Sequence, residues 1–173
     1  MNYSTGDCIH YGAHGICRVV GTEMKELGRE KKEYYLLTPI SQEHIRLYLP
    51  KDADPERVKV REVLSPEEIF ALVEKEKGYC EKWIHDSKLR RETYNKILRS
   101  GDTAGLMAMV RTIHAHQEEL PAGKSLPMSD LELMRSGEKL LYNEFGYVLH
   151  MEKEQVLPFI LGECTLEAKE IIG

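Results

Sequence analysis

The stretch VREVLSPEEIF, residues 60–70, decides the fold, because the residue pattern of the chain changes within it. Ser65 is followed by a proline and, three residues on, by Glu68, which is the pattern of a capped helix start with proline at the first helical position. Before Ser65, short runs alternate between apolar and polar residues, whereas after it apolar residues recur at helical spacing. The stretch therefore predicts a β unit over residues 1–63 and a helical unit over residues 64–173.

The β unit consists of short runs separated by residues typical of turns. The five runs are DCIHY, GICRVVGT, KEYYLLTP, IRLYLP and RVKVREV. In IRLYLP, period-2 geometry puts Ile45, Leu47 and Leu49 on one face of the strand. Arg46 and Tyr48 then lie on the other face. Sixty residues of this kind predict a small, five-stranded β-barrel of the SH3 or Tudor type.

The helical unit predicts an all-α bundle, so the expected fold class is α+β. The expected helices cover residues 67–76, 81–99, 103–119, 129–150 and 152–163. Ser129 and Glu132 match a capping box at the start of the longest helix. Pro158 is expected to split or kink the last one.

Composition bounds the protein's class. With 42% hydrophobic residues, the 173-residue chain can bury a core, and no apolar run approaches the roughly 20 residues of a membrane helix. We expect a cytoplasmic protein with reduced thiols and no membrane contact. The cysteines are Cys8, Cys17, Cys80 and Cys164. The common phosphate-binding, nucleophile and metalloprotease motifs are absent from the sequence, so we expect no enzyme, no cofactor and no small-molecule substrate.

Charge is distributed unevenly along the chain. Residues 1–64 hold ten basic and ten acidic residues, so the net charge of −5 belongs to the helical unit. Within that acidic unit, residues 82–99 carry a net positive charge, and the only tryptophan, Trp83, lies near their start. The basic residues are Lys82, Lys88, Arg90, Arg91, Lys96 and Arg99. A basic helix led by an aromatic residue indicates a directed patch.

A cluster near the N-terminus allows two interpretations. Thiolates and imidazoles bind zinc, so Cys8, His10, His14 and Cys17 form a candidate site. However, the usual short cysteine pair is absent, and the glycines beside His14 suit a tight turn. The spacing favours a plain β-hairpin over a metal site.

The order of these elements resembles the CarD/CdnL family of bacterial transcription regulators. The resemblance rests on Gly-Asp-x-x-x-Tyr at residues 6–11, on His-Gly-Ile at 14–16 and on the strand with Glu-Tyr-Tyr at 33–35. Further matches are VKVREVLSPEE, the Arg-rich segment LRRETYNKILRSGDTAGLMAMVRTIH and the closing LPMSDLELMRSGEKLLYNEFGYVL. Together they cover residues 3–150 in the same order as in the family.

The resemblance implies a role for the β unit. In the family this unit binds the β-subunit lobe of RNA polymerase, largely through an edge strand, which can pair its free backbone groups with a partner. IRLYLP matches the contacting strand, so Arg46 and Tyr48 are candidate contacts. Lys25, on the preceding turn, matches a basic contact position. Without the resemblance, these residues would be ordinary solvated positions.

For the helical unit, the resemblance implies contact with promoter DNA in the minor groove near the −10 element. There a tryptophan wedges into the upstream edge of the melted region and basic residues hold the backbone. The counterparts here are Lys82, Trp83, Lys88, Arg90 and Arg91. Periodicity alone instead favours Trp83 as a core residue. The closing helix also begins with acidic residues where one branch of the family has basic ones, so an adaptor that binds polymerase without touching DNA is the alternative.

Overall fold

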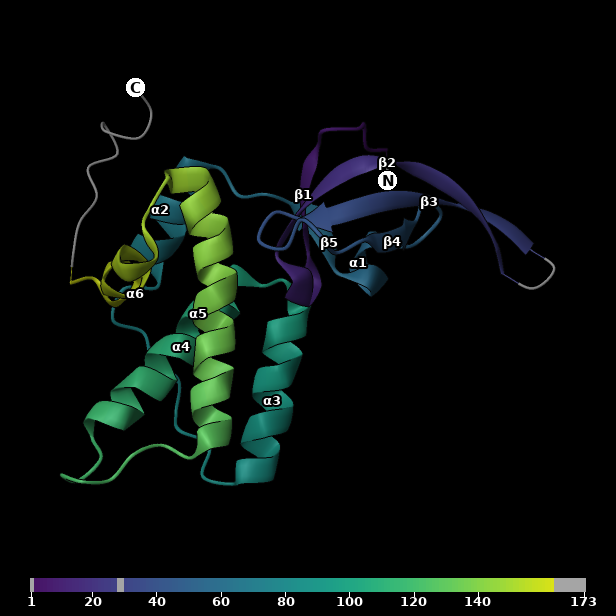
Figure 1. Ribbon diagram of the computed structural model, residues 1–173. Helices are drawn as coiled ribbons and strands as arrows, with labels where there is room; N and C mark the ends of the chain where they lie inside the picture. Colours follow the sequence, from purple (N-terminus) through teal and green to yellow (C-terminus); the bar gives the residue numbers. More distant parts are fainter. Residues whose placement is uncertain (1, 28–29, 164–173) are drawn as a thin grey trace. The chain divides into compact units, whose positions relative to one another are not determined.

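The computed structural model describes residues 2–27 and 30–163. The chain divides into two compact units, residues 1–63 and 64–173. The first contains a β-sheet and the second is helical (Figure 1). The predicted α+β class is therefore confirmed.

The sheet is antiparallel and open. Its strands are β1 (Cys8–Tyr11), β2 (Ile16–Leu27), β3 (Glu30–Pro39), β4 (Leu47–Pro50) and β5 (Val60–Glu62). They lie in the order β4-β3-β2-β1-β5, and the outer strands β4 and β5 do not pair with each other. The five predicted strands are present, but the sheet does not close into a barrel. The outer two strands have only four and three residues, and so offer few backbone groups with which to close the sheet.

The alternation that predicted the fourth strand is present. Leu49 is buried, Leu47 is half-buried and Tyr48 between them is exposed. Leu49 packs with Tyr35 and Leu37 of β3 in the core of this unit. The regular strand begins at Leu47, so the predicted strand starts too early. A 3-10 turn at Gly12–His14 and a short helix α1 (Pro55–Val58) complete the unit.

Five helices form the described part of the second unit. They are α2 (Pro66–Lys75), α3 (Ser87–Ser100), α4 (Thr103–Glu118), α5 (Met128–Leu149) and α6 (Lys153–Leu161). The capping box predicted at Ser65 is present. The Ser65 hydroxyl accepts from the Glu68 N–H at 3.2 Å, and the Glu68 carboxylate accepts from the Ser65 N–H at 2.7 Å.

Three features of the predicted helices differ in the structure: one start, one cap and one break. The helix expected from residue 81 begins at Ser87, because the Asp86 carboxylate caps it by accepting from the Leu89 N–H at 2.7 Å. Trp83 therefore lies before the helix. The first turn of α5 has no side-chain cap at Pro127, its N-cap position, so the capping box predicted at Ser129 is wrong. α6 continues through Pro158 and is not split.

Close packing and one buried arginine hold the helical unit together. A Cβ on Gly137 of α5 would lie 2.7 Å from Met109 and 2.8 Å from Val110, so a larger residue would force these side chains of α4 to shift. Arg111 of α4 is 2% exposed and donates to the carbonyls of Glu76 and Ile160, at the ends of α2 and α6. Burial lowers the pKa of this guanidinium. α4 is thus the element to which the shorter helices attach.

Candidate functional site

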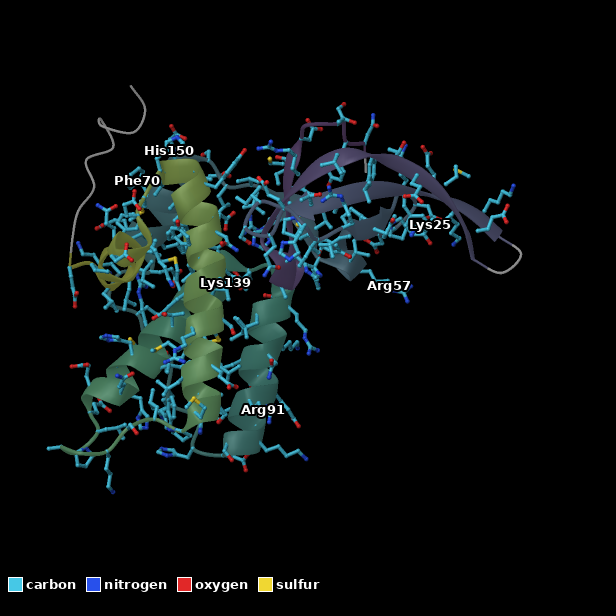
Figure 2. The ribbon with its side chains drawn as sticks, in the orientation of Figure 1. Lys25, Arg57, Phe70, Arg91, Lys139 and His150 are labelled. Carbon is cyan, nitrogen blue, oxygen red and sulfur yellow. The ribbon has the colours of Figure 1, made fainter. Side chains whose placement is uncertain are left out.

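The first candidate surface lies on β4, which ends the sheet on one side. The Tyr48 side chain is 37% exposed, and the Lys25 ammonium from β2 lies 3.2 Å from its ring centre. The ring of Tyr34 meets Tyr48 edge-on, with 6.3 Å between the ring centres. The structure thus brings two of the three predicted polymerase contacts together, although they are distant in sequence. Figure 2 labels Lys25 on the β2–β3 hairpin.

Arg46 lies just before β4. Its side chain is exposed, and Nη1 donates to the Thr38 hydroxyl of β3 at 2.8 Å and to the Glu43 carbonyl at 2.6 Å. These bonds hold the guanidinium against the last residues of β3. The third predicted contact is therefore also on the protein surface, next to the edge strand. Sequence reasoning missed Tyr34, whose place beside Tyr48 depends on the pairing of β3 with β4.

The second candidate surface is the exposed face of α3. Four basic side chains on this helix are exposed, and Glu92 is the only acidic residue within it. These four are Lys88, Arg91, Lys96 and Arg99. Helical geometry puts Lys88, Lys96 and Arg99 on the side opposite the buried Arg90 and Tyr94. Arg91 lies at the edge of this face, next to Leu98. Lys96 and Arg99 were absent from the predicted site, although the 3.6-residue period relates them to Lys88. Figure 2 labels Arg91 on this helix.

Trp83 does not stand free in front of α3. It is half-buried and packs against the helical core. Its indole is stacked on the imidazole of His116 of α4, with ring centres 3.7 Å apart and planes 16° apart. The guanidinium carbon of Arg90 lies 4.4 Å from the indole ring centre. The indole ring is therefore already in contact with the His116 imidazole and the Arg90 guanidinium. This agrees with the packed position that periodicity favoured.

Arg90 faces inward. It is 5% exposed and forms two hydrogen bonds to Asp130 of α5, from Nε at 3.0 Å and from Nη2 at 2.7 Å. Its Nη1 donates to the carbonyl of Ile84 at 2.6 Å. This burial contradicts a surface contact from Arg90 to a DNA phosphate, because the guanidinium is used to bind Asp130 and the segment before α3. Lys82, Lys88 and Arg91, by contrast, are exposed.

The zinc hypothesis fails on geometry and on protonation. Cys17 lies opposite Ile9 and Cys8 lies opposite Arg18, so the two cysteines point to different faces of the sheet. Burial raises the pKa of the Cys17 thiol to about 12, which disfavours the thiolate that zinc requires. His14 is exposed at the turn, whereas His10 is fully buried. No group of three metal-binding side chains gathers within residues 2–27 and 30–163.

The described helices include none long and apolar enough to cross a membrane.

The comparisons with known proteins give different results for the two units. No curated protein matches the chain. Residues 3–63 match the family model described as CarD-like/TRCF RID domain. The match covers the open sheet with its β4 edge and ends where the helical unit begins. The RID domain is a non-catalytic module that interacts with the β subunit of RNA polymerase, and residues 3–63 of this chain form a domain of that family.

Proposed function

We propose that this protein docks on the β-subunit lobe of RNA polymerase through β4 and stabilises the open promoter complex through its helical unit. The contacts proposed on the polymerase side are Lys25, Arg46 and Tyr48. On the promoter side, near the upstream edge of the melted region and the −10 element, they are Lys82, Lys88 and Arg91. The predicted contact Trp83 instead supports this surface by packing against the helical core before α3. Such a protein works in the cytoplasm and has no catalytic role of its own.

The observation that carries the proposal is the edge strand of the matched domain, with its exposed side chains. β4 pairs with β3 on one side only in the described sheet, so its other side can add a partner strand. Backbone hydrogen bonds would supply affinity, and the outward residues would supply specificity. Tyr48 offers a large, rigid ring and Arg46 a guanidinium, and these residue types are enriched at interface centres.

The basic face of α3 supports contact with DNA. The helix has 14 residues and is about 21 Å long at 1.5 Å per residue. Its exposed lysines and arginines can therefore reach several phosphates along a groove. Such contacts fix the position of a protein on the duplex without reading its sequence. They also make binding fall steeply as salt is raised.

Together the two contacts would lengthen the life of the open complex. The sheet would hold the helical unit beside the promoter, and contacts that exist only with melted DNA would oppose re-annealing. The net charge of −5 fits a protein that reaches DNA through one face and is brought there by polymerase, not by bulk attraction.

A binding experiment tests the docking step. The full chain and the Arg46→Ala/Tyr48→Ala double variant are compared in their affinity for intact RNA polymerase, with Arg57→Ala as the control at an exposed residue of α1. We expect the double variant to bind roughly tenfold or more weakly, because it removes two large interface side chains. Arg57→Ala should bind like the wild type. Equal affinity of the double variant would contradict docking through β4.

The adaptor alternative, in which the helical unit never touches DNA, draws support from the packed position of Trp83. Charge substitution separates it from the proposal without disturbing the core. In a Lys88→Ala/Arg91→Ala/Lys96→Ala/Arg99→Ala variant, all changed side chains are exposed. If the helical unit holds DNA, this variant binds polymerase normally but shortens the open-complex half-life. An unchanged half-life favours the adaptor.

A further inference from the structure

Leu89 is an apolar side chain in an unusual place. It lies in the first turn of α3 and is 54% exposed. Its neighbours along the chain are Lys88, which is exposed, and Arg90, which is buried. Lys96 follows two turns later on the same face of the helix. Leu89 is therefore a bulky hydrophobic residue within the basic face of α3, although nothing in the helical core requires it there.

The backbone of Leu89 is fixed from both sides. Its N–H donates to the capping carboxylate of Asp86 at 2.7 Å. The next residue, Arg90, is bound to Asp130 in the first turn of α5. Leu89 is thus a side chain on a rigid helix start, which is the condition for inserting it into a partner without a large loss of chain entropy.

A second exposed apolar residue lies at the same end of the unit. Met128 begins α5 and is 64% exposed. The Arg90–Asp130 pair joins the first turns of α3 and α5, and both helices start at the same end of the helical unit (Figure 1). The exposed apolar side chains therefore belong to the end that carries Lys88. Trp83 contributes less there, because His116 and Arg90 already cover its ring.

We infer that Leu89, and not Trp83, is the side chain that inserts at the opened base step, with Lys88 and Lys96 on the neighbouring phosphates. This inference rests on the proposed function and names the residue that performs it. Leucine is among the apolar residues that partly unstack base steps from the minor groove. Trp83 is then a positioning residue, which supports the start of α3 through Arg90. The charges around Leu89 complement a polyanion, which is why the expected occupant is DNA.

The test uses the full chain with intact polymerase and a promoter that carries 2-aminopurine at the upstream edge of the melted region. Leu89→Ser removes the apolar wedge at an exposed site, and Leu89→Met preserves it. Trp83→Phe keeps an aromatic ring against His116 and Arg90. Tyr79→Ser is the control at an exposed ring elsewhere in the unit, with 51% of its side chain exposed. The readouts are the open-complex half-life and the 2-aminopurine fluorescence.

We expect Leu89→Ser to shorten the half-life roughly fivefold or more and to lower the fluorescence gain, because the edge step is no longer unstacked. Leu89→Met, Trp83→Phe and Tyr79→Ser should behave like the wild type. A normal half-life with Leu89→Ser overturns the inference. So does a Trp83→Phe protein that has native circular dichroism yet loses the half-life effect. If the wild type itself leaves the half-life unchanged, the proposed function fails, and the inference with it.

Discussion

A cation lies over an aromatic ring in each of the two units. In the sheet it is Lys25 over Tyr48, and in the helical unit it is Arg90 over Trp83. Tyr48 is 37% exposed. Trp83 is half-buried, and the Arg90 that lies over its ring is 5% exposed and bound to Asp130. The same type of contact thus serves different purposes. On the surface it presents a side chain to a partner, and in the core it fixes the start of a helix.

The difference follows from solvation. An exposed cation and an exposed ring can leave their mutual contact and bind a partner at little cost in free energy, because water solvates both. A buried guanidinium without its carboxylate would remain unsolvated and unpaired, so the Arg90–Asp130 contact has to persist. In the sequence the two pairs look alike, because each consists of a basic residue and an aromatic residue from candidate binding segments.

The largest expected effect is the loss of the buried ion pair. Asp130→Ala leaves the Arg90 guanidinium buried without its carboxylate and should lower the free energy of unfolding by about 3–5 kcal/mol. Urea unfolding followed by circular dichroism measures this change. The matched control is Arg91→Ala, one residue along and exposed, which should stay within about 0.5 kcal/mol of the wild type. A cost below about 1 kcal/mol for Asp130→Ala would break the comparison.

Trp83 should show the next effect. Because its ring is half-buried between His116 and Arg90, Trp83→Ala should lower the free energy of unfolding by about 2 kcal/mol, less than truncation of a fully buried tryptophan. Trp83→Phe should cost less, since it retains a ring. Thermal unfolding by circular dichroism gives both values. If Trp83→Ala is as stable as the wild type, the indole is not a packing residue.

Tyr94 sharpens the picture of the helical core. It is 1% exposed, its hydroxyl has no hydrogen-bond partner in the described residues, and burial, with Glu81 adding to it, raises its pKa to about 12. Tyr94→Phe should leave the free energy of unfolding at neutral pH unchanged or raise it by up to about 1 kcal/mol.

The raised pKa of Tyr94 also gives a pH dependence. The native state holds this proton more tightly than the unfolded state, whose tyrosine has a pKa near 10, so stability falls as the pH rises from 10 towards 12. Urea unfolding at pH 7, 10 and 11 should show a smaller loss for Tyr94→Phe than for the wild type. Identical slopes for the two proteins would contradict a buried, protonated hydroxyl.

The smallest effect on stability is expected at the surface pair. Lys25→Ala, Tyr48→Ala and the double variant should each stay within about 1 kcal/mol of the wild type in unfolding experiments. A double-mutant cycle from the same data gives the coupling between the two side chains. A coupling above about 2 kcal/mol would show that this pair holds the sheet together, and the contrast with Arg90 and Trp83 would disappear.

Parts of the fold were open to prediction because they depend on near neighbours. The capping box at Ser65 and Glu68 involves residues three apart, and the alternation at Leu47–Leu49 is a property of one strand. The open sheet and the start of α3 were not predicted correctly. Closure depends on the lengths of β4 and β5 together, and the competing cap at Asp86 decides where α3 begins.

The candidate sites divide in the same way. Sequence determined that a basic segment with a tryptophan precedes Gly101, and that Arg46 and Tyr48 point away from the core. Only the tertiary structure decided that Lys25 reaches Tyr48, and that Arg90 turns inward to an aspartate 40 residues away. Charge and periodicity can be recognised within short stretches of the sequence. Whether a cation faces water or a buried carboxylate depends on which helices pack together, and no single segment contains that information.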